Sequence, residues 1–301
     1  MNNKAQSPGI NTIFQPETYL LVLITYSIGF SLVRYLGGDL DVLTGILGVI
    51  LCWLILLTQR LLHAYFEHPD SFLSSLLKDD PEYEALKYFK RPMLLQFALL
   101  VLAAGAALTL VLLQRKPVGL SVLIFIGMAL LFTFFSVVPP LRLEKQGFGE
   151  LIETLFVAIL VPAIGFSLQR ADIPQLLVFF TLPIAFVYLA MKIVFNFRKY
   201  ASDSALGRKS LTTLLGWQKA LVLHNLLVLS AFILIGLFSL LGLPWSFTRG
   251  LLLALPIGGL QIYLMIRLGE GDRPRWALLT WVAAGLLMVS CYLVTVTMWI
   301  K

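Results

Sequence analysis

Charged residues are scarce in this 301-residue sequence. Only 13% of the residues are Asp, Glu, Lys or Arg, 59% are hydrophobic, and the mean hydropathy is +0.88. A soluble domain of this length needs far more charge to cover its surface. The composition therefore predicts an integral membrane protein and leaves no room for a separate soluble domain.

Several chemical signatures are also missing from the sequence. Its two cysteines, Cys52 and Cys291, lie in apolar runs, where packing explains them better than a disulfide does. The sequence contains no Cys/His metal spacing, no Gly-rich phosphate loop and no nucleophile elbow. Residues 1–16 form a polar N-terminal tail without the basic start of a signal peptide, so we expect no cleavage there.

Long apolar runs are what the sequence does contain. About 20 apolar residues are needed to cross the hydrocarbon core of a bilayer. Runs of that length predict an all-α, polytopic membrane domain over residues 17–301 with nine transmembrane helices. The predicted spans are 17–36, 41–65, 92–113, 117–138, 149–168, 175–196, 218–242, 247–267 and 275–300.

Basic residues are distributed unequally between the two sets of connections. Sixteen Lys and Arg fall on one side and six on the other, which predicts that the richer side is cytoplasmic in a multi-pass protein of the plasma (inner) membrane. The net charge of +7 then reflects topology and attraction to anionic lipid headgroups rather than nucleic-acid binding. Nearly all carboxylates are on the same side, so we expect the active face to be cytoplasmic.

Three segments on this side carry the motifs. They read SVVPPLRLEKQGFGELIETL at 136–155, NFRKYASDSALGRKSLTTLLG at 196–216 and LHAYFEHPDS at 62–71. Together they resemble the UbiA superfamily of intramembrane prenyltransferases. The first resembles its proline pair and Gly-x-Gly-Glu run, and the second its menaquinone-type Asn-x-Arg-Asp-x-x-x-Asp motif. The third lies where the family has its other aspartate-rich motif.

The resemblance implies a fold and a mechanism. Nine helices would surround a central cavity, and the two aspartate-rich motifs would face each other across it. Their carboxylates would hold Mg²⁺, which suits hard oxygen ligands, and the metal would bind the diphosphate of a prenyl donor. Positive charge on the departing diphosphate and an apolar cavity would then help the allylic C–O bond to ionise.

The sequence departs from the family pattern within both aspartate-rich motifs. In the second, Asn196, Arg198 and Asp203 match, but Lys199 stands in place of an aspartate. In the first, Glu67 replaces the second aspartate, and the other differences involve His63, Ala64, Asp70 and Ser71. We therefore expect a weakened Mg²⁺ site.

Helical spacing places the motif residues on two faces. Lys192, Asn196, Lys199 and Asp203 follow a four, three, four spacing, which predicts one helical face directed into the cavity. Arg60, Ala64, Glu67 and Ser71 repeat that spacing on the second helix. Since cations equal or outnumber carboxylates on these faces, they suit an anion better than a divalent cation.

We assign candidate roles accordingly. The sharpest hypothesis is that Lys199, with Arg198 and Lys192, contacts diphosphate without a full pair of Mg²⁺ ions. Asp203, Asn196 and Glu67 are the candidate catalytic residues. The same three, with Asp70, are the candidate metal ligands. The candidate substrate-binding residues are Arg198, Lys199, Arg142, Lys145, Lys192 and Arg60.

Simpler explanations stay open for several of these residues. Lys192 can extend to the interface, and Lys199 can serve topology alone. Glu67 can pair with Arg60 seven residues away or with a neighbouring helix. Glu150 and Glu153 suit the positive start of the fifth helix, and Glu153 could also help to rebuild a metal site.

The leading hypothesis is a prenyltransferase that transfers a prenyl group from a prenyl diphosphate to a lipophilic or aromatic acceptor, with a quinone-ring precursor as first guess. The alternative is a family member that has lost catalysis and binds an isoprenoid or anionic lipid, or acts as a partner subunit. A solute transporter has less support, because the sequence shows no internal inverted repeat and its motifs lie on one side.

Overall fold

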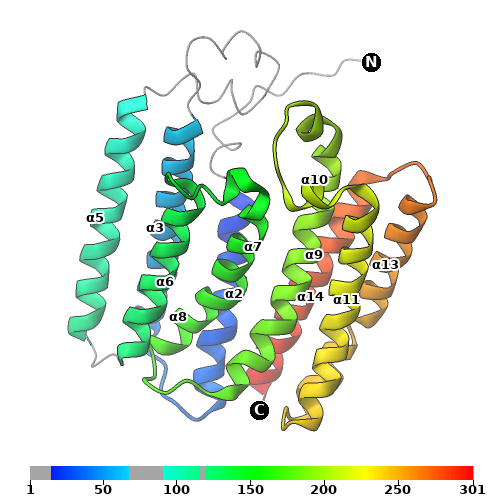
Figure 1. Cartoon of the computed structure of the whole chain (residues 1–301). Helices are drawn as coiled ribbons and strands as arrows, with labels where there is room; N and C mark the ends of the chain where they lie inside the picture. The colour runs from blue at the N-terminus through cyan, green and yellow to red at the C-terminus, as the bar shows by residue number, and fades with distance from the viewer. Residues whose placement is uncertain (1–14, 68–90, 116–118, 301) are drawn as a thin grey trace, which may run out of the picture.

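The computed structural model describes residues 15–67, 91–115 and 119–300, and these residues form helices without a strand. The helices run side by side in one bundle (Figure 1). Two predictions concern residues outside these ranges, namely most of the polar N-terminal tail and the end of the first motif, with Asp70 and Ser71.

The helix boundaries follow the predicted apolar spans. Eight helices are long and apolar enough to cross a bilayer, and α12 with α13, which meet at 42°, can form a ninth span. The all-α fold with about nine spans is thus confirmed. In chain order the elements are α2 (Pro16–Tyr35), α3 (Val42–Glu67), α5 (Arg91–Arg115), α6 (Leu120–Val137), η2 (Glu144–Phe148), α7 (Gly149–Thr154), η3 (Leu155–Leu160), α8 (Val161–Ser167), α9 (Gln175–Ala205), α10 (Leu211–Leu215), α11 (Trp217–Leu240), α12 (Trp245–Leu252), α13 (Leu255–Gly269) and α14 (Trp276–Ile300).

Burial separates central helices from peripheral ones. The most apolar window of α9 is 78% buried inside the protein, and that of the fifth span, η2 to α8, is 72% buried. The corresponding value for α5, at one edge of the bundle in Figure 1, is only 17%. Exposed side chains of α5 such as Leu99 and Leu100 are apolar, as expected of a helix that faces lipid. The fifth span and α9 therefore form the centre on which a site can be built.

A proline explains the irregular course of the fifth span. Pro162 has no N–H to donate to the turn before it. That turn, η3, is a widened π-helical turn in which the N–H of Val161 donates to the carbonyl of Phe156, five residues back. Widening of this kind lets a helix continue past a missing donor.

The second motif is largely helical, although it lies between the predicted spans 175–196 and 218–242. α9 continues to Ala205, and Gly207 ends it in a left-handed conformation with φ of 67°. The N–H of Arg208 donates to the carbonyl of Asp203 at 2.8 Å, and the N–H of Gly207 donates to Ser204, which is the Schellman pattern. Ser210 then caps α10 through a capping box with Thr213. The second motif therefore consists of the end of α9, a hydrogen-bonded turn and the short helix α10.

Close packing of α2 on α8 requires a glycine. A Cβ atom at Gly29 would lie 1.9 Å from the carbonyl oxygen of Pro162, which is backbone and cannot rotate away. Small residues allow this close approach between membrane helices.

We expect Gly29→Ala to destabilise the protein by about 1–3 kcal/mol, because the added methyl group must push α2 away from α8. The measurement is thermal unfolding of the purified protein in detergent. The matched control is Gly127→Ala in α6, where a Cβ would meet nothing within 4 Å. Equal melting temperatures for the two variants would contradict the packing described.

Candidate functional site

One buried carboxylate joins four helices near the end of the bundle that carries the motifs. The Oε2 atom of Glu153 in α7 lies 3.0 Å from Nζ of Lys192 in α9, and its Oε1 lies 3.8 Å from Nη2 of Arg60 in α3. The hydroxyl of Tyr188 in α9 donates to Oε1 at 2.9 Å, and that of Thr18 in α2 donates at 3.4 Å. Glu153 thus has two cations and two hydroxyls around it; these five residues are called the Glu153 cluster below.

Arg60 and Lys192 bring two positive charges to Glu153. Two further carboxylates interact with the same cations, since Glu144 acts on Arg60 and Glu150 on Lys192. The side chains of Arg60 and Glu153 are 7% and 11% exposed, so water does little to screen them. The electrostatic attraction between Glu153 and the two cations is therefore strong.

A second buried carboxylate, Glu150, joins two of the sequence motifs. The side-chain amide of Asn196 in α9 donates to Oε1 of Glu150, and the N–H of Leu211 at the start of α10 donates to Oε2 at 3.2 Å. Both helices of the second motif, α9 and α10, are in this way attached to the GFGE segment. Gly147 in the same segment adds to the contact, since a Cβ there would lie 2.4 Å from the Cδ1 atom of Leu214.

The end of α3 contacts η2 through two ion pairs. His63 Nδ1 lies 3.2 Å from an oxygen of Glu144, and Glu67 lies 2.9 Å from Nζ of Lys145. Arg60, His63 and Glu67 lie on one face of α3, and this face therefore contacts both η2 and Glu153. Of the two partners considered for Glu67, the structure shows the neighbouring helix, since Glu67 pairs with Lys145 of η2 and Arg60 pairs with Glu153.

The end of α6 and the segment that follows it also contact α3. The guanidinium of Arg142 lies over the ring of Phe66, 5.2 Å from its centroid, and Gln59 donates to the hydroxyl of Ser136 at 3.2 Å. The Nε–H groups of Arg60 and Arg142 are buried and have no acceptor within the described ranges. Two guanidinium groups thus keep a donor available for a bound anion.

Comparison with known proteins identifies the family. A sequence model of the UbiA prenyltransferase family matches residues 89–283, which is more than half of the chain. The chain belongs to the UbiA prenyltransferase family. No curated protein sequence is significantly similar to this chain.

Solved structures share the UbiA fold across nearly the whole chain. A digeranylgeranylglyceryl phosphate synthase aligns with a TM-score of 0.63 and 17% identity, covering 94% of this chain and 93% of its own. A UbiA homologue from Archaeoglobus fulgidus, bound to DMAPP and Mg²⁺, aligns at 0.61 with 15% identity over 95% and 99%. A homologue from Aeropyrum pernix K1 aligns at 0.52 with 15% identity over 92% and 97%. At these identities the similarity concerns the fold alone.

The structure brings some of the predicted site residues of this UbiA member together. Arg60 and Lys192 meet at Glu153, Asn196 contacts Glu150, and Glu67 pairs with Lys145. Arg142 lies on Phe66 beside them. Elsewhere, Asp203 is half-buried near the end of α9, Arg198 and Lys199 are exposed on α9, and Asp70 lies outside the described ranges.

Two members of the Glu153 cluster were missed in the sequence. Tyr188 lies four residues before Lys192, so extending the predicted face of α9 by one turn would have included it. Thr18 had no signal, because a threonine in the first apolar span is ordinary. Glu153 was considered as a metal ligand, whereas the structure surrounds it with cations.

The carboxylates near the Glu153 cluster do not fit a pair of Mg²⁺ ions. Across residues 15–67, 91–115 and 119–300, no three His, Cys, Asp or Glu side chains gather as a metal site. Glu67, Glu144 and Glu153 each face a basic side chain instead. A divalent cation would have to displace those groups.

We expect Glu153→Gln to destabilise the protein by about 3–5 kcal/mol, because it leaves two buried cations without their counter-ion. The measurement is thermal or denaturant unfolding in detergent. Adding Lys192→Met to the same chain should recover part of the loss, since one of the two cations is then removed.

The matched control is Asp172→Asn. Asp172 pairs with Arg170 at 2.8 Å, but its side chain is 55% exposed, so its loss should cost about 0–1 kcal/mol. If Glu153→Gln costs no more than Asp172→Asn, Glu153 does not hold the four helices together.

Proposed function

We propose that this UbiA-family protein transfers a prenyl group from a prenyl diphosphate to a lipophilic or aromatic acceptor within the membrane. The observation that supports this most is the pair of buried basic side chains, Arg60 and Lys192, that meet at the Glu153 cluster. Arg60 and Lys192 lie at the motif-bearing end of an otherwise apolar bundle. A ligand with an anionic head and an apolar chain matches both parts of that arrangement.

Diphosphate binding would use groups that the structure already positions. A diphosphate carries more negative charge than one carboxylate, so it would compete with Glu153 for Arg60 and Lys192. The buried Nε–H donors of Arg60 and Arg142 would then gain acceptors. Lys145 is close by on η2, paired with Glu67. Arg198 and Lys199, exposed on α9, would meet the diphosphate on its way in.

The transfer would proceed by ionisation. The allylic C–O bond breaks and its electron pair leaves with the diphosphate. The resulting carbocation alkylates the acceptor, which then loses a proton. Arg60 and Lys192 would stabilise the negative charge that develops on the diphosphate, and the apolar side chains below would exclude water from the carbocation.

Our proposal for this chain differs from the homologue structures with bound ligands in that it assigns no role to Mg²⁺. The A. fulgidus homologue was solved with Mg²⁺ and either DMAPP or GPP. In our chain the described carboxylates do not fit that metal, so we assign no step to it and give the charge-stabilising role to Arg and Lys. The predicted metal ligands Asp203, Asn196, Glu67 and Asp70 stay predictions, as do a quinone-ring acceptor and a cytoplasmic active face.

One observation favours a second candidate, a family member that binds a prenyl diphosphate or an anionic lipid without turnover. The carboxylates that metal-dependent ionisation would need are paired with basic side chains of the same protein. A protein that only holds an anionic lipid needs no such carboxylates.

The deciding experiment incubates the purified protein with labelled prenyl diphosphates of several chain lengths and a mixture of aromatic acceptors, with and without a chelator. We expect release of diphosphate that persists in the chelator. Lys192→Met should lower that release by about 100-fold, because it removes one preorganised charge.

The control for the variant is again Asp172→Asn, whose rate should equal that of the wild type. Binding without release would support the second candidate. If the protein neither binds the prenyl diphosphates nor releases diphosphate from them, both proposals are contradicted.

A further inference from the structure

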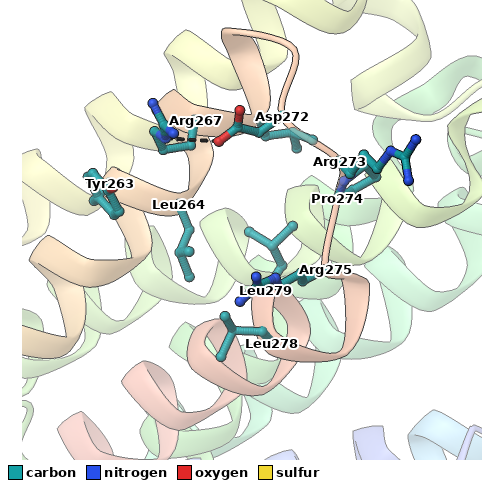
Figure 2. A pocket seen from close by; sticks show the side chains of 10 residues that line it. Tyr263, Leu264, Arg267, Asp272, Arg273, Pro274, Arg275, Leu278 and Leu279 are labelled. Carbon is teal, nitrogen blue, oxygen red and sulfur yellow. Dashed lines mark ion pairs between the residues drawn. The ribbon is translucent and has the colours of Figure 1, made fainter.

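A basic pocket lies between the last two helices, away from the Glu153 cluster. It is a hollow of about 390 Å³ between the end of α13 and the start of α14, closed by the turn that connects them (Figure 2). None of the Glu153 cluster residues lines it. The side chains around it are Tyr263, Leu264, Arg267, Leu268, Asp272, Arg273, Pro274, Arg275, Leu278 and Leu279.

The pocket is built from one apolar part and one basic part. Leu264 and Leu278 lie on its two sides, and Arg275 extends between the helices toward its centre (Figure 2). In the described part of the chain, the structure gives the guanidinium of Arg275 no ion pair. The N-terminus of α14, a 25-residue helix, begins at the next residue and adds its positive end.

Arg267, one of the three arginines at the pocket, is restrained by acidic neighbours. Arg267 Nε lies 2.8 Å from Asp272, and its Nη1 lies 3.3 Å from Glu270. Figure 2 shows the pair of Arg267 and Asp272 at the edge of the hollow. Asp272 therefore limits the positive potential of the pocket. The side chain of Arg273 points away from the hollow, whereas that of Arg275 extends toward it (Figure 2).

The position of the pocket matches the depth of a lipid headgroup. The connection between α13 and α14 lies at the same end of the bundle as α10 (Figure 1). Exposed apolar side chains, including Tyr263 at 56% and Leu278 at 39%, continue from the pocket along both helices. A basic hollow directly above an apolar surface is the arrangement that a phospholipid meets at the membrane interface.

We propose that this pocket binds an anionic phospholipid, with Arg275 on the phosphate and the leucine side chains against the glycerol and first acyl carbons. The lining has three arginines and one aspartate, so its positive charge selects a lipid with net negative charge over a zwitterionic one. The proposal does not depend on prenyl transfer, because it uses none of the residues assigned to that reaction.

The test measures binding of phosphatidylglycerol to the delipidated protein in a neutral detergent by native mass spectrometry. Phosphatidylcholine, inorganic phosphate and diphosphate are measured alongside it. We expect phosphatidylglycerol to bind best. Arg275→Gln should weaken that binding about fivefold, and Asp272→Asn should strengthen it because one negative charge is removed from the lining.

The matched control is Lys219→Gln, which removes one exposed positive charge from the start of α11, outside the pocket lining. It should leave phosphatidylglycerol binding unchanged, and all variants are at exposed positions whose substitution should preserve folding. Three outcomes would overturn the proposal: equal binding of phosphatidylcholine, equal effects of Arg275→Gln and Lys219→Gln, or inorganic phosphate binding as tightly as the lipid.

Discussion

Two basic side chains cannot stay unpaired inside a helix bundle that is surrounded by lipid, and Glu153 is what pairs them. Its carboxylate contacts Arg60 and Lys192 from two different helices, while Tyr188 and Thr18 donate hydrogen bonds to it. Charges within membranes are costly and usually serve function. That one carboxylate joins α2, α3, α7 and α9 at this level of the bundle.

The same contact links stability with the proposed chemistry. Breaking a prenyl diphosphate requires positive charge that is already in place and apolar surroundings that exclude water. Glu153 keeps two cations buried before any substrate arrives, and Glu150 fixes the adjoining helix, turn and helix against the same short α7. In the proposed reaction, arginine and lysine would take the role that carboxylates and metal ions have in the pattern which the sequence resembles.

The spans and the family were predictable from the sequence, because long apolar runs and the GFGE and Asn196–Asp203 segments carry strong signals. The predicted faces of α3 and α9 were also informative, since Arg60, Lys192 and Asn196 reach the buried carboxylates of α7. Their partners were not predictable. Spacing gives a face within one helix, but the rotation of one helix against another depends on packing, such as the contact of Gly29 with Pro162. For this reason the spacing leaves both Arg60 and a neighbouring helix open as partners of Glu67, and only the structure identifies Lys145.

We propose that Lys192 forms an ion pair with Glu153 until a diphosphate takes the place of the Glu153 carboxylate. Solid-state NMR can measure this directly as the dipolar coupling between a ¹³C-labelled Glu153 carboxyl and the ¹⁵N-labelled amine of Lys192. Without ligand, the contact at 3.0 Å predicts a strong coupling, and a prenyl diphosphate should weaken it. A coupling that is absent in the free protein, or that the diphosphate leaves unchanged, would contradict the account.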